Sequence, residues 1–180
     1  MSMIVKTELN RRGFFAYSSA AALTVGVSSR AMALEAEGAS DYQYEVIRTE
    51  AEWRAQLSEF DYAILREGKT EKQKSSPHWN ETAEGIYHCK GCDLPSYDGK
   101  WKVVLKKGWA FFYHAVPNNV LTGIDGIIPP EYGDSAAGFA ALIETHCRRC
   151  GSHLGHLLIV EGIQTHCING ASLVFKSSTT

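Results

Sequence analysis

The sequence lacks a strong net charge and, beyond its first 33 residues, any long apolar run. Its 18 Lys and Arg residues nearly balance 20 Asp and Glu residues, which leaves a net charge of -2. A chain without a basic excess has no general electrostatic attraction to nucleic acid or to an anionic membrane. A membrane span needs about 20 consecutive apolar residues. We therefore expect no nucleic-acid partner and no membrane insertion of the mature chain.

The composition is that of a soluble globular protein. Of 180 residues, 44% are hydrophobic and 21% are charged, which suffices for one domain with a buried core. These proportions exclude disorder and collagen-like repeats as descriptions of the whole chain. The five cysteines stand at positions 89, 92, 147, 150 and 167. They form two CxxC pairs and one singleton, a pattern that indicates a chemical role for the cysteines instead of two disulfides and a spare thiol.

Residues 1–33 have the pattern of a removable signal peptide. Arg11 and Arg12 precede a modestly apolar run over residues 13–27, and residues 31–33 form an A-x-A cleavage pattern. The stretch 10–15 resembles a twin-arginine export motif, and the weak hydrophobicity of the run suits that route. We expect an exported, periplasmic protein. The alternatives are an amphipathic N-terminal helix and a mitochondrial transit peptide.

The remaining chain divides into a spacer over residues 34–48, expected to be mobile and more strand-like over residues 42–47, and a domain over residues 49–176. Thr49 with Glu52, and Ser58 with Asp61, have the spacing of helix starts, and Gly68 ends the second helix. Short β-prone runs follow at 85–88, 102–105, 110–116, 139–145, 154–160, 164–169 and 171–176. We expect a mainly β fold of antiparallel sheets with short N-terminal helices.

The two CxxC pairs each stand where a strand enters a tight turn. Zinc takes four ligands in a tetrahedron, and a CxxC turn can present two thiolates to one ion. Cys89 and Cys92 with Cys147 and Cys150 would therefore complete a closed structural zinc site. The 54 residues between Cys92 and Cys147 imply that the metal joins two distant hairpins. The alternatives are two redox-active pairs and two local disulfides.

Cys167 lies in a β-prone run, where a period of two places it on one face with Asn169 and places His166 on the other. His153 and His156 leave the second CxxC turn in a stretch short enough to form a hairpin beside Cys167. A thiolate nucleophile needs a nearby group that lowers its pKa, and the two imidazoles are candidates. The alternatives are an inert core cysteine, structural histidines, and metal ligation by the two histidines.

These motifs resemble the methionine-R-sulfoxide reductase family. The similarity runs from about Thr49 to Lys176 and includes the stretch 62–71, the Gly108–Trp109 pair, and the runs 147–156 and 167–175. The resemblance implies two antiparallel sheets with a zinc site far from the active centre. It also implies that a cysteine thiolate attacks the sulfoxide sulfur of methionine R-sulfoxide, either free or in proteins.

Carried over by position, the resemblance makes Cys167 the nucleophile. It assigns His153 and His156 to the sulfoxide oxygen, Asn169 to a nearby hydrogen bond, and Trp109 to the substrate methyl group. The residue types fit this chemistry, because a sulfoxide oxygen is a poor leaving group until it is protonated, whereas the thiol must be ionised to attack. Such a site needs one acid and one thiol of low pKa within hydrogen-bond reach.

The chain departs from the family pattern at three places. Residues 108–112 are Gly-Trp-Ala-Phe-Phe instead of Gly-Trp-Pro-Ser-Phe, residues 158–162 replace a Phe-Asp-Asp-Gly stretch, and Thr165 with His166 replace Arg-Tyr. These changes remove an arginine and an acidic pair from the expected hydrogen-bond scaffold. A divergent, non-catalytic zinc-binding module is therefore an alternative, and a thiol peroxide sensor is another.

With four cysteines assigned to the metal, none remains to form an internal disulfide with an oxidised Cys167. The sequence therefore predicts a one-cysteine cycle through a sulfenic acid. An external thiol reductant, such as a thioredoxin-like protein, would have to restore the thiol.

Overall fold

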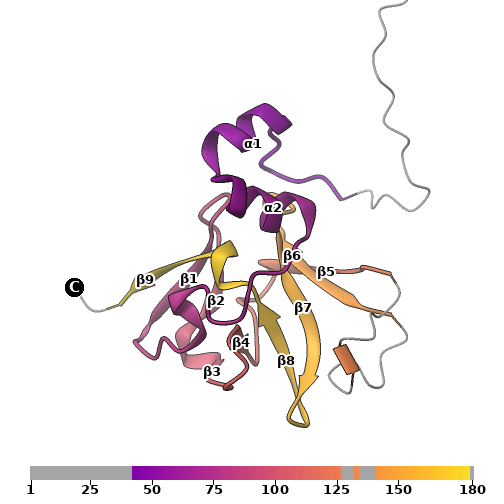
Figure 1. Ribbon diagram of the computed structural model, residues 1–180. Helices are drawn as coiled ribbons and strands as arrows, with labels where there is room; N and C mark the ends of the chain where they lie inside the picture. The colour runs from indigo at the N-terminus through magenta and orange to yellow at the C-terminus, as the bar shows by residue number, and fades with distance from the viewer. Residues whose placement is uncertain (1–41, 127–131, 134–140, 179–180) are drawn as a thin grey trace, which may run out of the picture. The chain divides into compact units, whose positions relative to one another are not determined.

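The computed structural model describes residues 42–126, 132–133 and 141–178 (Figure 1). The expected signal peptide, residues 1–33, and the first part of the expected spacer lie outside these residues. Within the described part of the chain, no helix has the length and apolarity needed to cross a bilayer.

Two short helices open the described chain, as predicted. α1 (Glu50–Gln56) begins at the capping box, in which the Thr49 side chain accepts from the Glu52 N–H and the Glu52 carboxylate accepts from the Thr49 N–H. α2 (Glu59–Glu67) begins at Ser58 in a similar way and ends at Gly68, which has a φ of 68°. A left-handed residue favours glycine at this position. Both helix starts and the stop are thus confirmed.

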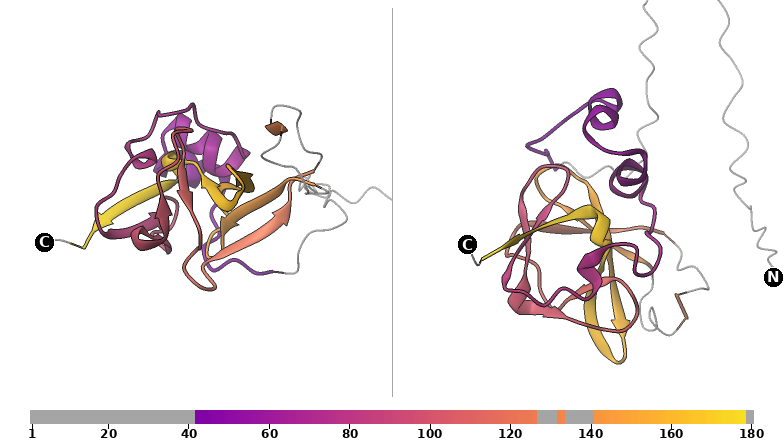
Figure 2. Two further views of the ribbon diagram at one scale, coloured as in Figure 1. Left: turned by 90° about the horizontal axis from the view of Figure 1, so that it is seen from below. Right: turned by 60° about the vertical axis from the view of Figure 1, so that its left-hand side comes forward.

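The described strands form two antiparallel sheets, which confirms the mainly β prediction (Figure 1). The smaller sheet has the order β2 (Pro95–Asp98), β1 (Gly85–Cys89) and β9 (Leu173–Ser177). The larger sheet has the order β3 (Lys102–Val103), β4 (Ala110–Phe112), β8 (Ile163–Ile168), β7 (His153–Val160), β6 (Ile143–Cys147) and β5 (Val120–Ile124). Figure 2 shows the C-terminal strand β9 beside β1, although these strands are far apart in the sequence.

Several strand boundaries differ from the prediction. The strand expected over residues 110–116 ends at Phe112, and the one expected over 171–176 begins at Leu173, because Gly170–Ser172 forms a 3₁₀ turn, η4. Two further 3₁₀ turns are η1 (Pro77–Trp79) and η2 (Gly99–Trp101). The strands β2 and β5 were not predicted, and each is an edge strand of its sheet.

Two hydrophobic clusters fill the domain, and strands β4 and β8 contribute to both. Phe112 and Ile168 belong to the first cluster, together with Trp53 of α1 and the buried cysteines of the CxxC turns. Phe111 belongs to the second cluster, and Cys167 packs against it. This division follows from the alternation of side chains along a strand. Cys167 and the paired cysteines therefore lie in different clusters.

The described part of the expected spacer, residues 42–48, lies against the second CxxC turn. The Val46 N–H donates to the Arg149 carbonyl at 2.9 Å, and Glu45 pairs with Arg148 at 2.6 Å. The strand expected over residues 42–47 is not formed in this described segment, and this prediction was wrong. The cause is that the backbone hydrogen bond goes to a turn instead of a neighbouring strand.

Candidate functional site

The β7–β8 hairpin sets the position of Cys167. Val160 pairs with Ile163 across a two-residue turn, Glu161 and Gly162, whose φ values are 53° and 78°. Two positive φ values are typical of the type I′ turn that joins tight hairpins. This turn fixes the register along both strands, so that His156 lies directly opposite Cys167. The predicted hairpin, with an imidazole beside the thiol, is thus present.

Gly155 allows the two strands to approach closely beside this pair. A Cβ atom at position 155 would lie 2.1 Å from the Cys167 carbonyl oxygen, a distance that the backbone cannot tolerate. Only glycine therefore fits at position 155, where β7 passes close to the backbone of Cys167.

A β-bulge brings His153 to the same side as His156. In a regular strand, residues three apart point to opposite faces. Between β6 and β7, however, Thr145 pairs with Gly155 while His146 pairs with His153, so that Leu154 is an extra residue in β7. A bulge of this kind redirects the side chains beyond it. The rings of His153 and His156 consequently lie with their centroids 5.1 Å apart.

Each histidine has a carboxylate partner that the sequence analysis missed. Glu144 of β6 accepts from His153 Nδ1 at 2.6 Å, and Asp125, just after β5, accepts from His156 Nε2 at 2.8 Å. A carboxylate in this position holds the proton on the nitrogen that it contacts and stabilises the imidazolium form. Both carboxylates come from segments that precede the histidines in the chain, β6 and the residue after β5. The only available signal was the position of Glu144 in the run that enters the second CxxC turn.

Burial opposes charge at both histidine–carboxylate pairs. It lowers the pKa of His156 below its ordinary value, against the hydrogen bond from Asp125. Burial also opposes ionisation of Glu144, but the hydrogen bond and charge of His153 hold the Glu144 pKa below its usual range. His153 Nε2 is buried and has no hydrogen-bond partner among the described residues.

A pocket of about 370 Å³ opens over Cys167. Its lining is mostly apolar and comes from β7, β8 and the residue after it, the loop after α2, the loop before β4, and Tyr132. The lining residues are Thr70, Trp109, Tyr132, Gly155, His156, Leu158, Cys167 and Asn169. The structure thus brings four of the predicted site residues to one pocket, and it places His153 behind His156, outside the lining.

The Cys167 thiol is not a low-pKa thiol in this structure, contrary to the expectation from the two histidines. Burial first, and then the negative charge of Glu71, raise the pKa of Cys167 to about 12. His156 does not counteract this effect, because burial keeps its imidazole uncharged. The resting site therefore holds a neutral thiol opposite a neutral imidazole.

Glu71 joins several parts of the pocket, and the sequence analysis assigned it no role. Its buried carboxylate accepts from the N–H groups of Gly170 and Ala171 at 2.6 and 3.0 Å. Its backbone N–H donates to Asn169 Oδ1 at 2.9 Å, and its carbonyl accepts from Trp109 Nε1 at 3.2 Å. Burial raises the pKa of Glu71 despite these hydrogen bonds. The backbone of Glu71 thus orients two predicted site residues, while its carboxylate binds the turn that follows β8.

His166 lies on the opposite face of β8 from Cys167, as the period of two predicted. Its Nδ1 accepts from the Tyr97 hydroxyl at 3.2 Å, and its Cα pairs with Phe112 in β4. Burial, with a smaller contribution from His114, lowers the pKa of His166 to about 4. His166 is therefore a neutral histidine of the core.

The four paired cysteines converge as predicted. Their Sγ atoms all lie within 4.8 Å of one another, with Cys89 and Cys150 3.7 Å apart and Cys92 and Cys147 3.5 Å apart. All five cysteines are free, and these distances far exceed the ~2.05 Å of a disulfide. A tetrahedron of sulfurs at ~2.3 Å from a central ion has edges of roughly 3.8 Å. The donor set therefore fits a tetrahedral metal ion.

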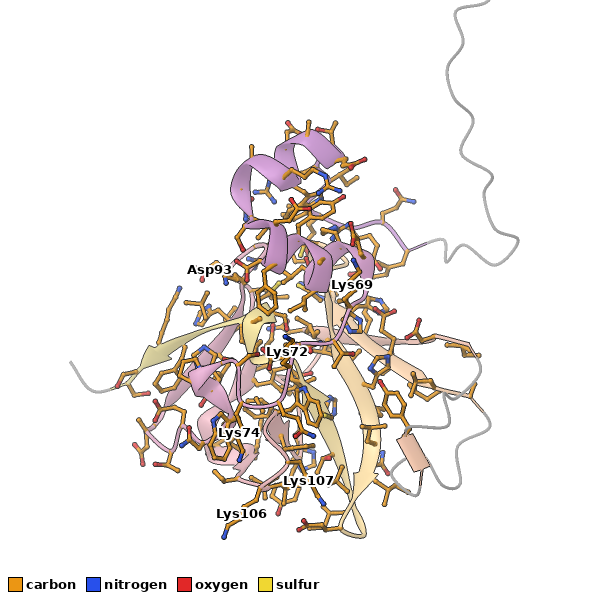
Figure 3. All side chains as sticks on the ribbon, viewed as in Figure 1. Lys69, Lys72, Lys74, Asp93, Lys106 and Lys107 are labelled. Atoms are coloured by element: carbon orange, nitrogen blue, oxygen red, sulfur yellow. The ribbon has the colours of Figure 1, made fainter. Side chains whose placement is uncertain are left out.

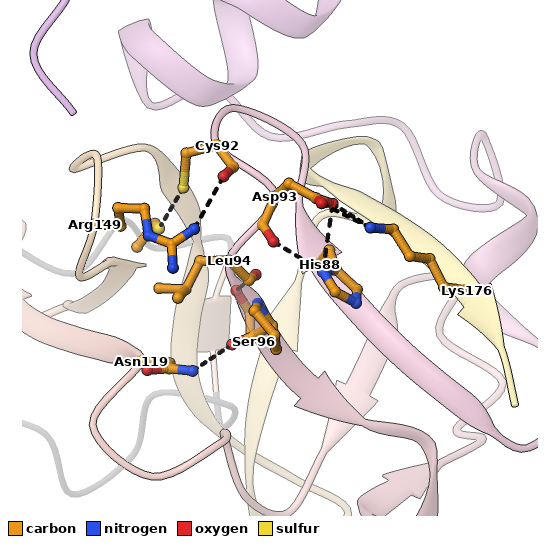
Figure 4. Close-up of polar contacts among 10 residues, drawn as sticks. His88, Cys92, Asp93, Leu94, Ser96, Asn119, Arg149 and Lys176 are labelled. Atoms are coloured by element: carbon orange, nitrogen blue, oxygen red, sulfur yellow. Dashed lines mark hydrogen bonds and ion pairs between the residues drawn. The ribbon is translucent and has the colours of Figure 1, made fainter. Parts of the chain in front are cut away.

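The two CxxC turns have the same backbone design. The N–H of the first cysteine donates to the carbonyl five residues later in both, at 2.8 Å in the turn of Cys89 and 2.9 Å in that of Cys147. The residue after each second cysteine has a positive φ, 61° at Asp93 and 67° at Gly151. Figure 4 shows that Asp93 also contacts His88 and Lys176, while Arg149 donates to the Cys92 carbonyl at 3.3 Å. These contacts hold each turn in place independently of the thiols.

The sequence is similar to one family model and to several known proteins. The family model described as the SelR domain matches residues 57–177. The peptide methionine sulfoxide reductase MsrB of Agrobacterium fabrum is 36% identical over 135 residues, which cover 73% of this chain and 93% of that protein. The peptide methionine sulfoxide reductase B3 of Arabidopsis thaliana is 33% identical over 91% of this chain and 85% of its own length. Among solved structures, the "Yippee-like" domain of Mis18 has a TM-score of 0.41 and 16% identity, covering 54% of this chain and 99% of that one.

Proposed function

We propose, from the premise that the chain belongs to the SelR family of methionine sulfoxide reductases, that it reduces methionine R-sulfoxide to methionine through a sulfenic acid on Cys167. The observation that carries this proposal is the pairing of Cys167 with His156 across the β7–β8 hairpin, in a pocket walled by Trp109. Side chains directly opposite in an antiparallel pair have Cβ atoms ~5 Å apart. A sulfoxide in this pocket can therefore contact the thiol and the imidazole together.

Because its pKa is raised, the Cys167 thiol is protonated before the reaction, and it supplies the proton that the sulfoxide oxygen needs. As the Cys167 sulfur attacks the substrate sulfur, His156 takes the thiol proton and passes it to the sulfoxide oxygen. Asp125 stabilises the imidazolium that exists during this transfer. The oxygen then moves from the methionine sulfur to the cysteine sulfur. The bond between the two sulfurs that the attack forms breaks in this step, and one S–O bond breaks as another forms. The methionine sulfur thus gains two electrons and Cys167 loses two, while the thiol proton ends on the sulfenic oxygen.

The two sides of the pocket differ in polarity, which supports recognition of the sulfoxide group. Trp109 offers an apolar wall for the methyl group, whereas His156 offers a hydrogen-bonding group to the oxygen. His153 supports His156 from outside the lining, with the ring centroids 5.1 Å apart. A chiral sulfoxide presents its methyl group and oxygen in the correct order for only one epimer. We infer that this arrangement selects one epimer, which is the R form in the proposed reaction.

An external thiol completes the cycle in this proposal. The other four cysteines converge on one another in the CxxC turns, so none is free to resolve the sulfenic acid. Two external thiols reduce it, with release of water and formation of one disulfide between them. A thioredoxin-like protein is the expected donor, and dithiothreitol can replace it in an assay.

Zn²⁺ is the proposed ion of the four-cysteine cluster. Cys89, Cys92, Cys147 and Cys150 would hold it, and the ion would supply a structural cross-link between β1 and β6 without contact with substrate. Thiolate ligands in a tetrahedron select zinc or an iron–sulfur centre among the common biological metals.

Export to the periplasm is part of the same proposal. Its support is the pair Arg11 and Arg12 ahead of a weakly apolar run, and the A-x-A pattern over residues 31–33. A twin-arginine substrate crosses the membrane folded, so that zinc could bind in the reducing cytoplasm. Expression with Arg11 and Arg12 changed to Lys, followed by cell fractionation, tests this route.

The function is tested by incubating the protein with an R-sulfoxide peptide and dithiothreitol and measuring the methionine product by mass spectrometry. We expect turnover with the R epimer and much less with the S epimer. Absence of turnover in a folded, metal-loaded protein would instead support the non-catalytic module. Sulfenic acid formation with hydrogen peroxide, without any methionine product, would support a peroxide sensor. The raised pKa of Cys167 opposes that last function, since sensor thiols are ionised and exposed.

A further inference from the structure

Two neighbouring segments carry a group of exposed lysines. The first segment joins α2 to η1, and the second joins β3 to β4. The Lys74 N–H donates to the Gly108 carbonyl at 2.7 Å, so the two segments touch. Figure 3 shows these side chains along one face of the domain. We call this group the basic rim, and its members are Lys69, Lys72, Lys74, Lys106 and Lys107.

The basic rim borders the pocket over Cys167. Thr70 lines the pocket and lies between Lys69 and Lys72 in the chain. Trp109 lines it as well and follows Lys107 by two residues. Any group that extends out of the pocket past Thr70 or Trp109 therefore meets the basic rim.

Several other surface cations of the domain are paired with carboxylates. Arg54 pairs with Glu50 at 2.8 Å and Lys100 with Asp98 at 2.9 Å, and Lys90, Arg148 and Lys176 form similar pairs. In the basic rim, Lys69 pairs with Glu67 and Lys107 lies 3.6 Å from Glu161. Within the described residues, Lys72, Lys74 and Lys106 have no ion-pair partner.

The acidic residue nearest Lys72 and Lys74 in the chain does not neutralise them. Glu71 turns its carboxylate inward, where the N–H groups of Gly170 and Ala171 bind it. The basic rim is thus a local excess of positive charge on a chain whose net charge is -2. A local potential of this kind steers ligands of opposite charge.

The methionine sulfoxide side chain itself does not need this charge. The sulfoxide group is neutral, and the pocket is lined mostly by apolar atoms. A pocket of about 370 Å³ is at the small end of ligand sites, so the residues that flank the methionine must lie outside it. Because an extended chain advances ~3.3 Å per residue, residues within three positions of the methionine remain within ~10 Å of the pocket mouth.

We propose that the basic rim selects oxidised methionines that are flanked by acidic residues. This inference rests on the proposed function and names its substrate class, acidic peptide segments that carry methionine R-sulfoxide. Lys72, Lys74 and Lys106 attract carboxylates at the flanking positions and so accelerate association and lower KM. The reaction inside the pocket, and therefore kcat, is unaffected by the flanking charge.

Three R-sulfoxide peptides that differ only in their flanking residues, Glu, Gln or Lys, test this inference with dithiothreitol as the reductant. We expect kcat/KM to be about 10-fold higher for the Glu peptide than for the Lys peptide at low ionic strength, and the ratio to approach 1 in about 0.5 M salt, where charges are screened. The double variant Lys72→Gln/Lys106→Gln should reduce the ratio to below about 3. The matched variant Arg54→Gln/Lys100→Gln removes two charges from elements that do not line the pocket and should keep the full ratio.

Equal kcat/KM values for the Glu and Lys peptides, with normal turnover of the Gln peptide, would overturn the inference and leave the proposed function intact. So would a result in which the rim variants slow only the reaction with an acidic protein reductant, since the rim would then bind the reductant. Binding of the three peptides to Cys167→Ser, followed by fluorescence anisotropy, measures the preference without turnover. Equal affinities there would overturn the inference even if the protein reduced no sulfoxide.

Discussion

The two CxxC turns and the pocket of Cys167 place the same side chain in opposite surroundings. In the turns, four thiols lie within 4.8 Å of one another, and three of them are buried in the first hydrophobic cluster. In the pocket, one thiol lies opposite an imidazole and packs against the second cluster. The neighbours therefore decide the role of each cysteine, because a thiol among thiols suits a metal and a lone thiol beside an imidazole suits proton transfer.

The single CxxC turns and the pocket also differ in the range of the interactions that build them, although the four-cysteine cluster joins turns up to 61 residues apart. Each CxxC turn is formed by hydrogen bonds within six residues of chain. The pocket depends on distant segments, since Glu71 contacts Gly170 from 99 residues away and Asp125 contacts His156 from 31 residues away. The metal region should thus govern stability, and the pocket should govern activity.

The largest expected effect is that of Cys167→Ser, which should abolish activity and leave metal binding and stability unchanged. A serine hydroxyl is far too weakly acidic to replace the thiol as a nucleophile, so methionine formation should fall below detection. Zinc content and the midpoint of thermal unfolding should remain close to those of the unchanged protein, because Cys167 lies outside the four-cysteine cluster. Loss of zinc from this variant would show that the two regions are coupled and would contradict the comparison.

The reverse experiment removes one ligand of the cluster. Cys150→Ser leaves three thiols around the metal, and its free energy of unfolding should fall by several kcal/mol, because binding of a structural zinc ion is coupled to folding. Metal analysis and urea denaturation measure the two effects. A zinc-free but equally stable protein would contradict this prediction, as would disulfides between Cys89 and Cys92 and between Cys147 and Cys150.

The two histidines beside Cys167, His156 opposite it in β7 and His166 next to it in β8, should differ in their effect on turnover. His156→Asn removes the proposed proton carrier opposite Cys167 and should lower kcat by roughly 10²-fold to 10⁴-fold, with a changed pH profile. His166→Asn is the matched control, because His166 contacts Tyr97 in the core and should matter little for turnover. If His166→Asn were the more damaging change, the assignment of roles across this strand would be wrong.

Much of the fold was predictable from the sequence, since its signals are local. The capping box of Thr49 and Glu52 and the two CxxC turns are each complete within a few residues. The strands β2 and β5 escaped prediction because each contains a residue that is rare in strand interiors. β2 starts with Pro95, and β5 contains Gly123. Both residues weaken the strand pattern, although edges tolerate them.

The candidate site was predictable only in part. The positions of Cys167 and His156 follow from the length of a hairpin. The approach of the His153 ring to the His156 ring depends instead on the bulge at Leu154, which no residue pattern predicts. The roles of Glu144 and Glu71 depend on tertiary contacts. The pKa of Cys167 was misjudged for the same reason, because burial and a distant carboxylate outweigh the neighbouring imidazole.

The smallest predicted effect is a shift in the titration of Cys167. Glu71→Gln removes one of the two influences that raise this pKa, the other being burial. The thiol should then ionise at lower pH, by up to about one pH unit, and iodoacetamide should alkylate Cys167 faster at a given pH between 8 and 10. Mass spectrometry of the peptide that contains Cys167 measures this rate. Ser75→Ala removes a 3.3 Å hydrogen bond to the same carboxylate but no charge, so it should leave the alkylation profile in place. If both variants shifted the profile equally, packing and not the charge of Glu71 would control the thiol.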